Sequence, residues 1–521
     1  MPVWKTFLHN GIAFPPPHDV KGVGIMIGGR TVSLSPLADE MAYNFAKKKD
    51  TPYVHDPVFV ENFMKYFAKE LPTEYRSAKY SEIDFSRFYT LVDREKRVKE
   101  AMTKEEKKSQ AASRKARREE MKERYGRATI DGKEVDIANW LAEPPGLFMG
   151  RGTHPLRGSW KPRVERAEVI LNLDASASKP EGWEGKVVHE PESIWIAKWI
   201  DKLTGKEKYV WPHEGSEIQQ SRNKEKYDKA LRIGGQLEKL RRVILKSMSS
   251  KDARVAKTAT VCYLIDRLGM RVGDEKDEDE ADTVGATTLR VEHIKMGEKG
   301  VDFDFLGKDS VRWEKTLDDP EPILVQNLRK FTAGKKPADE VFDVVTSSKV
   351  NQFLSRVVPG ASAKVFRTYH ASVVAEKRLR RQDLRSGDDL EKLYFAKEAN
   401  LEAAIFCNHK RTPPKNWDES LKKKEQKLEE YMAKGKESMV RKTSMNVEFT
   451  RKTKDYNLNT SLKNYIDPRI YKSWCDYAGL DWGRLYTASL QRKFSWVAKS
   501  RRPWSEEQEQ EEPVVAVEQN G

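Results

Sequence analysis

The chain has 521 residues, a formal net charge of +15 and 38% hydrophobic content, which predicts a soluble globular protein of two or more domains. The positive charge favours a polyanionic partner, with nucleic acid the commonest one and an anionic membrane surface the competing interpretation. No apolar run approaches the roughly 20 residues that span a bilayer, and the cysteines are widely separated, so we expect an intracellular protein without a membrane span, a disulfide framework or a zinc site.

The first part of the chain, from about residue 4 to residue 213, is expected to be a mixed α/β region. Turn signals such as Pro15-Pro16-Pro17 and Pro144-Pro145-Gly146 divide it into short elements. The segment from Asp93 to Arg127 combines good helix formers and alternating charge signs with few apolar residues. It predicts an exposed pair of helices.

The middle part, as far as Asn408, is predicted to be mainly helical with a small sheet. Apolar residues recur at helical spacing over residues 221–248 and 255–268, which predicts core helices. In the first of these helices the expected core residues are Leu231, Ile233, Leu237, Leu240 and Ile244.

Two further segments of the middle part have a clear pattern. Alternation of Val301, Phe303 and Phe305 before Gly307 predicts a strand. The acidic segment 274–282 lacks the regular alternation and the central glycine of a calcium loop, so we expect a solvated loop.

The last part begins with a break at Pro413-Pro414 and a lysine-rich segment that extends to Tyr456. Leu421 and Leu428 lie at heptad spacing in it, which predicts a protruding helical hairpin. A final helical stretch is expected over residues 468–500, and the Glu-rich residues 505–521 are expected to be disordered.

The residues that we expect to carry the chemistry are spread over the middle and last parts of the chain. Together they supply a phenol nucleophile and a set of cationic or proton-donating groups that suit cleavage of a phosphodiester. They are Arg271, Lys308, Arg367, His409 and Tyr465. Such a set needs neither a nucleotide nor a metal ion, so we expect no cofactor and no metal ligand.

Lys308 follows Gly307, but this pair is not a nucleotide-binding phosphate loop. Asp302 stands where such a loop has its first glycine, and GKDS lacks the GK[ST] ending. The HExxH and GxSxG patterns are absent as well, so metalloprotease and serine-hydrolase chemistry are not supported.

Five strings occur in one order along the chain: LGMRVGDEK, VDFDFLGKDSVRW, AKVFRTYHAS, IFCNHKRTPPK and TSLKNYIDPRI. Their residues and their order resemble eukaryotic-type DNA topoisomerase IB, and EPPGLFMGRGTHP resembles the loop of that family on the minor-groove side. The resemblance extends from about Trp4 to Trp496, which is nearly the whole chain.

The resemblance implies a role for each candidate. Tyr465 is the nucleophile, Lys308 is the general acid, and the remaining three residues stabilise the charge that develops on the phosphate. It also implies DNA contacts by Arg151, Lys364, Asp309 and Asn464, the last two beside the cleaved step where camptothecin-like inhibitors stack. The chain has Leu462-Lys463 where the family commonly has lysine directly after the serine, and Met149 where a basic residue is frequent.

The implied fold is a multidomain α+β protein, a two-lobed DNA clamp whose mainly helical catalytic domain is related to tyrosine recombinases. The expected parts are a mixed α/β cap and DNA-binding lobe over residues 1–213, the catalytic core over 214–411, a helical-hairpin linker over 412–455, a C-terminal domain with the nucleophilic tyrosine over 456–504 and the acidic tail over 505–521.

The implied activity is relaxation of supercoiled duplex DNA through a 3′-phosphotyrosine intermediate, by a monomer that needs no ATP or metal ion. The protein would act on chromosomal DNA, in the nucleus of a eukaryotic owner and otherwise in the cytoplasm or nucleoid. The alternatives are a tyrosine site-specific recombinase and a catalytically inactive architectural DNA-binding protein. Recombinases usually have a histidine three residues before the second arginine, and Lys364 stands there.

Overall fold

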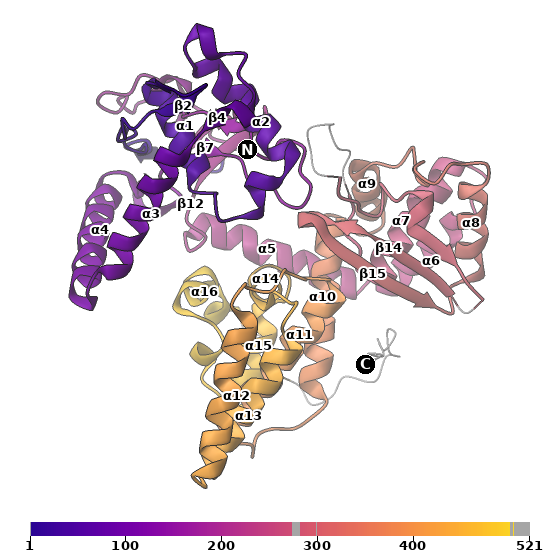
Figure 1. The fold of residues 1–521 in the computed structure, drawn as a ribbon. Helices are drawn as coiled ribbons and strands as arrows, with labels where there is room; N and C mark the ends of the chain where they lie inside the picture. Colours follow the sequence, from indigo (N-terminus) through magenta and orange to yellow (C-terminus); the bar gives the residue numbers. More distant parts are fainter. Residues whose placement is uncertain (1, 274–281, 299, 501–503, 505–521) are drawn as a thin grey trace. The chain divides into compact units, whose positions relative to one another are not determined.

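The computed structural model describes residues 2–273, 282–298, 300–500 and 504. It divides into two compact units, the first ending at Gln219 and the second beginning at Gln220 (Figure 1). Among the described residues, no helix is both long and apolar enough to cross a membrane. The acidic segment 274–281 and the tail 505–521 lie outside the described residues.

The first unit is built on a seven-stranded sheet of order β1-β5-β6-β12-β11-β9-β10. Neighbouring strands of this sheet are antiparallel, for example β1 and β5 with Phe7 opposite Ile130, except that β10 is parallel to β9. Trp4, Leu171 and Ile196 belong to the apolar core of this sheet. The strands are β1 (Phe7–His9), β5 (Arg127–Ile130), β6 (Lys133–Ala138), β9 (Ile170–Asn172), β10 (Val187–Val188), β11 (Ala197–Ile200) and β12 (Glu207–Pro212).

A second core in this unit is aromatic. Phe45 stacks on Phe63 with ring centroids 4.2 Å apart, and Phe63 stacks on Phe67. The core lies among a three-stranded sheet of order β3-β2-β4, two helices and Phe88 of the helix that follows. These elements are β2 (Ile25–Ile27), β3 (Arg30–Val32), β4 (Ile83–Asp84), α1 (Pro36–Ala46) and α2 (Pro57–Phe67).

The charged segment of the first unit forms two helices, as predicted. They are α3 (Ser86–Ala101), which buries only Phe88, and α4 (Lys104–Tyr125), which buries no side chain. Thr103 begins α4 with a reciprocal capping box to Glu106. α3 therefore packs one face against the aromatic core through Phe88, Tyr89 and Val92, whereas α4 has no buried face and is capped locally at Thr103.

The second unit begins with helices where the periodicity predicted them, but the segment 221–248, expected as one helix, is two helices separated at Gly235 and Gln236. Leu231 was expected in the core, but its side chain is 41% exposed. Leu231 lies outside the buried stripe of its helix, which Tyr227, Ala230 and Ile233 form. The helices are α5 (Glu217–Gly234), α6 (Leu237–Met248), α7 (Ala253–Leu268), α8 (Pro322–Thr332), α9 (Ser347–Val357), α10 (Ala363–Arg380) and α11 (Asp389–Phe406).

The predicted small sheet is the antiparallel set β13 (Ile294–Met296), β14 (Gly300–Gly307) and β15 (Val311–Asp318). Val301, Phe303 and Phe305 are buried, as their alternation predicted. Figure 1 shows β14 and β15 as long neighbouring strands, and their register ends with Gly307 opposite Val311. Lys308 therefore lies in the turn of this hairpin.

Two apolar cores of the second unit meet along α10. Its first turns contribute Val365 and Phe366 to the core of α6, α7 and the small sheet. Its later turns contribute Ala371 and Ala375 to the core that contains Tyr465. Arg367 lies between these two sets, so α10 brings it to the seam of the cores.

The lysine-rich segment forms α12 (Trp417–Ala433) and α13 (Glu437–Lys452), which pack as the predicted hairpin (Figure 1). The final stretch was expected as one helical piece, but it is broken. Gly479 adopts φ +69° and ends α15 in a left-handed cap, the conformation that glycine favours. The remaining elements are α14 (Leu458–Asn464), α15 (Pro468–Ala478) and α16 (Ala488–Lys493).

Candidate active site

Four of the five predicted catalytic residues lie together in the second unit. The hydroxyl of Tyr465 accepts hydrogen bonds from Arg271 Nη1 at 3.3 Å and from Arg367 Nη1 at 3.2 Å. The ring of His409 lies beside the phenol, with centroids 4.8 Å apart. Tyr465 is only 6% exposed, so these contacts are made largely out of water, where a charged donor counts most.

Arg271 is placed by the end of α7. Gly269 caps this helix with φ +65°, and a Cβ there would lie 2.8 Å from the ring of Phe406. Only glycine can make this turn so close to the end of α11. The carbonyl of Arg271 then accepts from the backbone N–H of Ala286 at 2.9 Å, which fixes the backbone from which the guanidinium extends.

Arg367 uses each guanidinium nitrogen. Nε donates to the carbonyl of Gly269 at 2.8 Å, Nη2 donates to the carbonyl of Cys407 at 2.9 Å, and Nη1 faces Tyr465. The residue is 3% exposed. The guanidinium is thus held by the ends of two helices, whose carbonyls carry the negative end of the helix dipole.

His409 follows the end of α11, where Asn408 adopts φ +49° and the N–H of His409 donates to the carbonyl of Ala404. Its Nδ1 lies 2.7 Å from Ser461 Oγ. Its Nε2 is buried and has no hydrogen-bond partner among the described residues. Burial and the charges of Arg367 and Arg271 lower the pKa of His409 to about 2, so the ring is neutral at physiological pH.

Tyr465 is the residue that ends α14, and its N–H donates to the carbonyl of Ser461 at 2.9 Å. Burial raises the pKa of a phenol, but the charges of Arg367 and Arg271 outweigh burial here, and the pKa of Tyr465 lies below its ordinary value. The arginines therefore favour the phenolate, which is the nucleophilic form.

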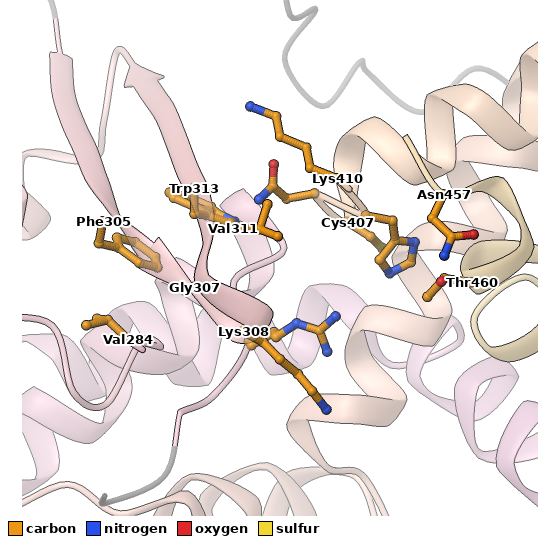
Figure 2. A pocket seen from close by; sticks show the side chains of 13 residues that line it. Val284, Phe305, Gly307, Lys308, Val311, Trp313, Cys407, Lys410, Asn457 and Thr460 are labelled. Atoms are coloured by element: carbon orange, nitrogen blue, oxygen red, sulfur yellow. The ribbon is translucent and has the colours of Figure 1, made fainter. Parts of the chain in front are cut away.

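The fifth candidate, Lys308, is exposed in the turn after β14. It lines a cavity of about 100 Å³ together with Arg271 and His409. Figure 2 shows its side chain extending from the hairpin, with Val311 and Trp313 on the neighbouring strand. Within the described chain, Tyr465 Oη hydrogen-bonds to the two arginines and not to Lys308. Lys308 is linked to the other candidates as a lining residue of the same cavity.

The predicted DNA contacts in the second unit flank these residues. Lys364 is exposed one turn before Arg367, and its charge also lowers the pKa of Tyr465. Asn464 precedes Tyr465, and its carbonyl accepts from Lys226 Nζ at 2.8 Å. The side chain of Asp309 lies outside what the structure describes.

Arg151 lies in the first unit, in the exposed loop between β7 (Gly146–Leu147) and β8 (Trp160–Lys161). The loop is anchored at Gly158, which has φ +89° and whose Cβ would lie 2.0 Å from the carbonyl oxygen of Phe59. Met149, which replaces the basic residue that is frequent in the family, packs against the aromatic core. The packing of the Met149 side chain therefore helps to hold this loop against the first unit's aromatic core.

Sequence reasoning missed Lys315. Its ammonium donates to the carbonyls of Leu268 at 3.0 Å and Phe406 at 2.6 Å, which lie at the ends of α7 and α11. Burial and the nearby charge of Arg367 lower its pKa to about 8. A signal was present, because Lys315 lies on the inward face of β15 between the buried Trp313 and Leu317.

Ser461 was also missed. It is fully buried and contacts His409, and it lies four residues before Tyr465. In a helix this spacing puts both residues on one face, which is the signal that could have found it. Leu462 packs into the core and Lys463 is partly exposed, so the leucine takes the inward position in the SLKNY order.

Comparison with known proteins covers nearly the whole chain. Residues 2–212 match the eukaryotic DNA topoisomerase I DNA-binding fragment, residues 215–442 match the catalytic core of the same family, and residues 437–506 match the C-terminal topoisomerase domain.

Among curated relatives, DNA topoisomerase 1 alpha of Arabidopsis thaliana is 35% identical over 95% of this chain and 58% of its own length. DNA topoisomerase 1 of Homo sapiens is 33% identical over 95% of this chain and 70% of its own length. The chain thus spans 58% of the length of the plant relative. These matches place the chain in the eukaryotic DNA topoisomerase I family.

Proposed function

We propose that this protein is a type IB DNA topoisomerase, which relaxes supercoiled duplex DNA by cutting and resealing one strand. The observation that carries the proposal is the Tyr465 hydroxyl, held between the guanidinium groups of Arg271 and Arg367 at 3.3 and 3.2 Å. A phenol in that position can attack a phosphate whose nonbridging oxygens take over the same donors.

In the cleavage step, the Tyr465 oxygen forms a bond to phosphorus, the phenol proton passes to solvent, and the bond from phosphorus to the 5′ oxygen breaks. Arg271 and Arg367 stabilise the negative charge that builds up on the nonbridging oxygens. Neutral His409 donates a further hydrogen bond from its unpartnered Nε2. The product is a 3′-phosphotyrosine, and attack by the 5′ hydroxyl reverses each step.

Lys308 donates the proton that the departing 5′ oxygen needs. An ammonium on a flexible stem can reach and release a proton, whereas a guanidinium gives up its proton reluctantly. Its exposed position beside the cavity supports this role. The reaction conserves the energy of the phosphodiester in the phosphotyrosine, so neither ATP nor a metal ion takes part.

The proposal extends to the architecture. A cap and DNA-binding lobe over residues 1–213, a recombinase-related catalytic core over 214–411, a linker hairpin over 412–455 and a C-terminal domain over 456–504 would form a two-lobed clamp, acting as a monomer. The family matches to residues 2–212 and 215–442 support a boundary near residue 213. Exposed basic residues such as Arg151 and Lys364 would contact phosphates mostly without reading sequence.

The matched relatives come from eukaryotes, which supports action on chromosomal DNA in a nucleus. Asp309 and Asn464 flank Lys308 and Tyr465 in sequence, and sensitivity to camptothecin is proposed on that ground. Cleavage complexes that do not increase with the drug would remove this point and leave the chemistry in place.

The deciding test is relaxation of a supercoiled plasmid in EDTA without ATP, together with adduct formation on an end-labelled nicked duplex. We expect relaxation without defined sites, and a covalent adduct that Tyr465→Phe does not form. Exchange between duplexes at defined sites would indicate a tyrosine recombinase instead. Binding without any adduct would indicate an architectural protein.

A further inference from the structure

A buried hydroxyl contacts the imidazole of the proposed active site. Ser461 Oγ lies 2.7 Å from His409 Nδ1, and Ser461 is fully buried. Among the described residues this is the one hydrogen bond of the hydroxyl. A buried O–H needs an acceptor, and the lone pair of Nδ1 is the acceptor within reach.

The direction of this hydrogen bond decides which nitrogen carries the ring proton. If Ser461 donates, Nδ1 is unprotonated and the single proton of the neutral ring lies on Nε2. His409 Nε2 is buried, has no partner within the described ranges, and belongs to a side chain that lines the cavity with Arg271 and Lys308. An Nε2–H beside this cavity could donate a hydrogen bond to an anion bound there.

Ser461 also belongs to the helix of the nucleophile. Its carbonyl accepts from the N–H groups of Tyr465 at 2.9 Å and Ile466 at 3.0 Å. Ser461 therefore contacts the imidazole of His409 through its side chain, and its backbone carbonyl closes the last turn of α14 at Tyr465. Ser461 thus helps to position both the imidazole of His409 and the backbone of Tyr465.

We propose that Ser461 is a positioning residue, whose hydroxyl donates to Nδ1 of His409 and so keeps Nε2–H available to a nonbridging phosphate oxygen. This inference rests on the proposed function. Ser461 does not touch the phosphate and acts through His409.

The first test is a double-mutant cycle in single-turnover cleavage of a nicked duplex. Ser461→Ala should slow adduct formation about tenfold to a hundredfold, the cost that is usual when a metal-bound histidine loses its outer hydrogen-bond partner. Adding Ser461→Ala to His409→Ala should cost less than about threefold more, because the ring through which Ser461 acts is gone. Independent, multiplicative effects would overturn the proposal.

Ser372→Ala is the matched control. Ser372 is a buried serine whose hydroxyl donates to Thr368 O at 2.8 Å, lies 3.3 Å from Tyr465 O and accepts from Asp467 N at 2.9 Å. It thus contacts the backbone of the nucleophile without contacting His409. Its effect should multiply with that of His409→Ala. Ser461→Thr, which keeps the hydroxyl, should restore most of the coupling that Ser461→Ala removes.

A chiral substrate separates positioning from a general loss of structure. When one nonbridging oxygen is replaced by methyl, one diastereomer lacks the oxygen that His409 serves. Ser461→Ala and His409→Ala should both slow cleavage of the diastereomer that keeps this oxygen. They should change cleavage of the diastereomer that lacks it only a little. Equal slowing of both diastereomers by Ser461→Ala would contradict the assignment.

The tautomer can be read without any activity. In wild-type protein labelled with 15N-histidine, His409 should show a pyridine-type Nδ1 and a pyrrole-type Nε2, and Ser461→Ala should mix the two forms. A protonated Nδ1 in the wild type would overturn this inference alone. If the wild type forms no adduct on DNA, the proposed function fails, and the NMR result still decides the role of Ser461.

Discussion

Lys315 and Arg367 bind adjacent carbonyl oxygens at the ends of the same two helices. Lys315 Nζ donates to Leu268 O and Phe406 O, and Arg367 donates to the next carbonyl of each segment, Gly269 O and Cys407 O. Two cations thus share the negative ends of α7 and α11. The segments that continue from these helix ends carry Arg271 and His409, so this clamp fixes the spacing of the site.

Removal of the Lys315 ammonium should loosen this clamp. Lys315→Met keeps the length of the stem but leaves the carbonyls of Leu268 and Phe406 without their donor, and a buried unsatisfied group costs about 1–3 kcal/mol. We expect the free energy of unfolding to fall by about that amount and single-turnover cleavage to slow at least about tenfold, because small misplacements are costly. Chemical denaturation and adduct kinetics measure the two effects.

Lys295→Met is the control for this change. Lys295 is an exposed lysine on β13 of the same small sheet, so its loss should alter stability by less than about 0.5 kcal/mol. Equal behaviour of the two variants would show that Lys315 is not a clamp.

Arg367→Lys should not be tolerated, although it keeps the charge. A single ammonium cannot replace the fork that reaches Gly269 O, Cys407 O and the Tyr465 hydroxyl together. We expect cleavage to slow by about a hundredfold to a thousandfold, the usual cost of one lost transition-state donor. Binding of the uncut duplex, measured by fluorescence anisotropy, should change far less, and a parallel loss of binding would argue against a transition-state role.

His9 makes the stability of the first unit depend on pH. Its Nε2 lies 3.0 Å from the carbonyl of Asn172, and its Nδ1 accepts from the N–H of Gly11 at 3.1 Å. Burial lowers the pKa of His9 to about 4, opposed by the Asn172 hydrogen bond. The unfolded chain therefore takes up a proton near pH 6.5 that the folded unit refuses until about pH 4, and stability falls as pH drops through this window.

We expect His9 to cost the folded state on the order of 2 kcal/mol between pH 7 and pH 5. His9→Gln should be less stable at pH 7 but should show a flatter pH dependence. Thermal unfolding of the whole chain from pH 4.5 to 7.5 measures this, and parallel curves for variant and wild type would refute it.

Asp266 holds α6, α7 and α10 together. Its carboxylate pairs with Arg241 Nε at 2.9 Å and with His370 Nε2 at 2.8 Å, and it is 2% exposed. Burial opposes ionisation, but His370 and Arg241 outweigh it and lower the pKa of Asp266 to about 2. Asp266→Asn should therefore lower the free energy of unfolding by on the order of 3 kcal/mol, because it removes the buried carboxylate that joins Arg241 and His370.

Asp343→Asn provides the comparison for Asp266. Asp343 is half exposed and pairs with Lys257 and Lys335 on the surface of the same unit. Its replacement should cost less than about 1 kcal/mol by urea denaturation. If the two variants were equally stable, Asp266 would not be a structural centre.

Periodicity predicted most elements of the second unit but not their details. Leu231 matched the apolar spacing and is nevertheless exposed, because the buried stripe needs only part of a helix surface. Gly479 divided the last helical stretch, although a glycine there is a recognisable stop signal. Such errors arise where local preference leaves several solutions and tertiary packing chooses among them.

The site could be predicted as a set of residues but not as a geometry. Arg271 and Tyr465 are 194 residues apart in sequence, and no local pattern brings them together. The resemblance to a family grouped them, while Lys315 and Ser461 were missed because their roles depend on contacts between segments. The inward parity of Lys315 and the helical spacing of Ser461 were the traces that they left in the sequence.

The helix that presents the nucleophile is only seven residues long, from Leu458 to Asn464. Helices of this length are not stable in isolation, so α14 persists because Ser461 and Leu462 are buried against the rest of the unit. Fraying of these roughly two turns would move the Tyr465 hydroxyl away from its two arginines while the surrounding helices stay intact. We therefore expect adduct formation to depend on local opening of α14, which amide hydrogen exchange would report, more than on the global stability of the protein.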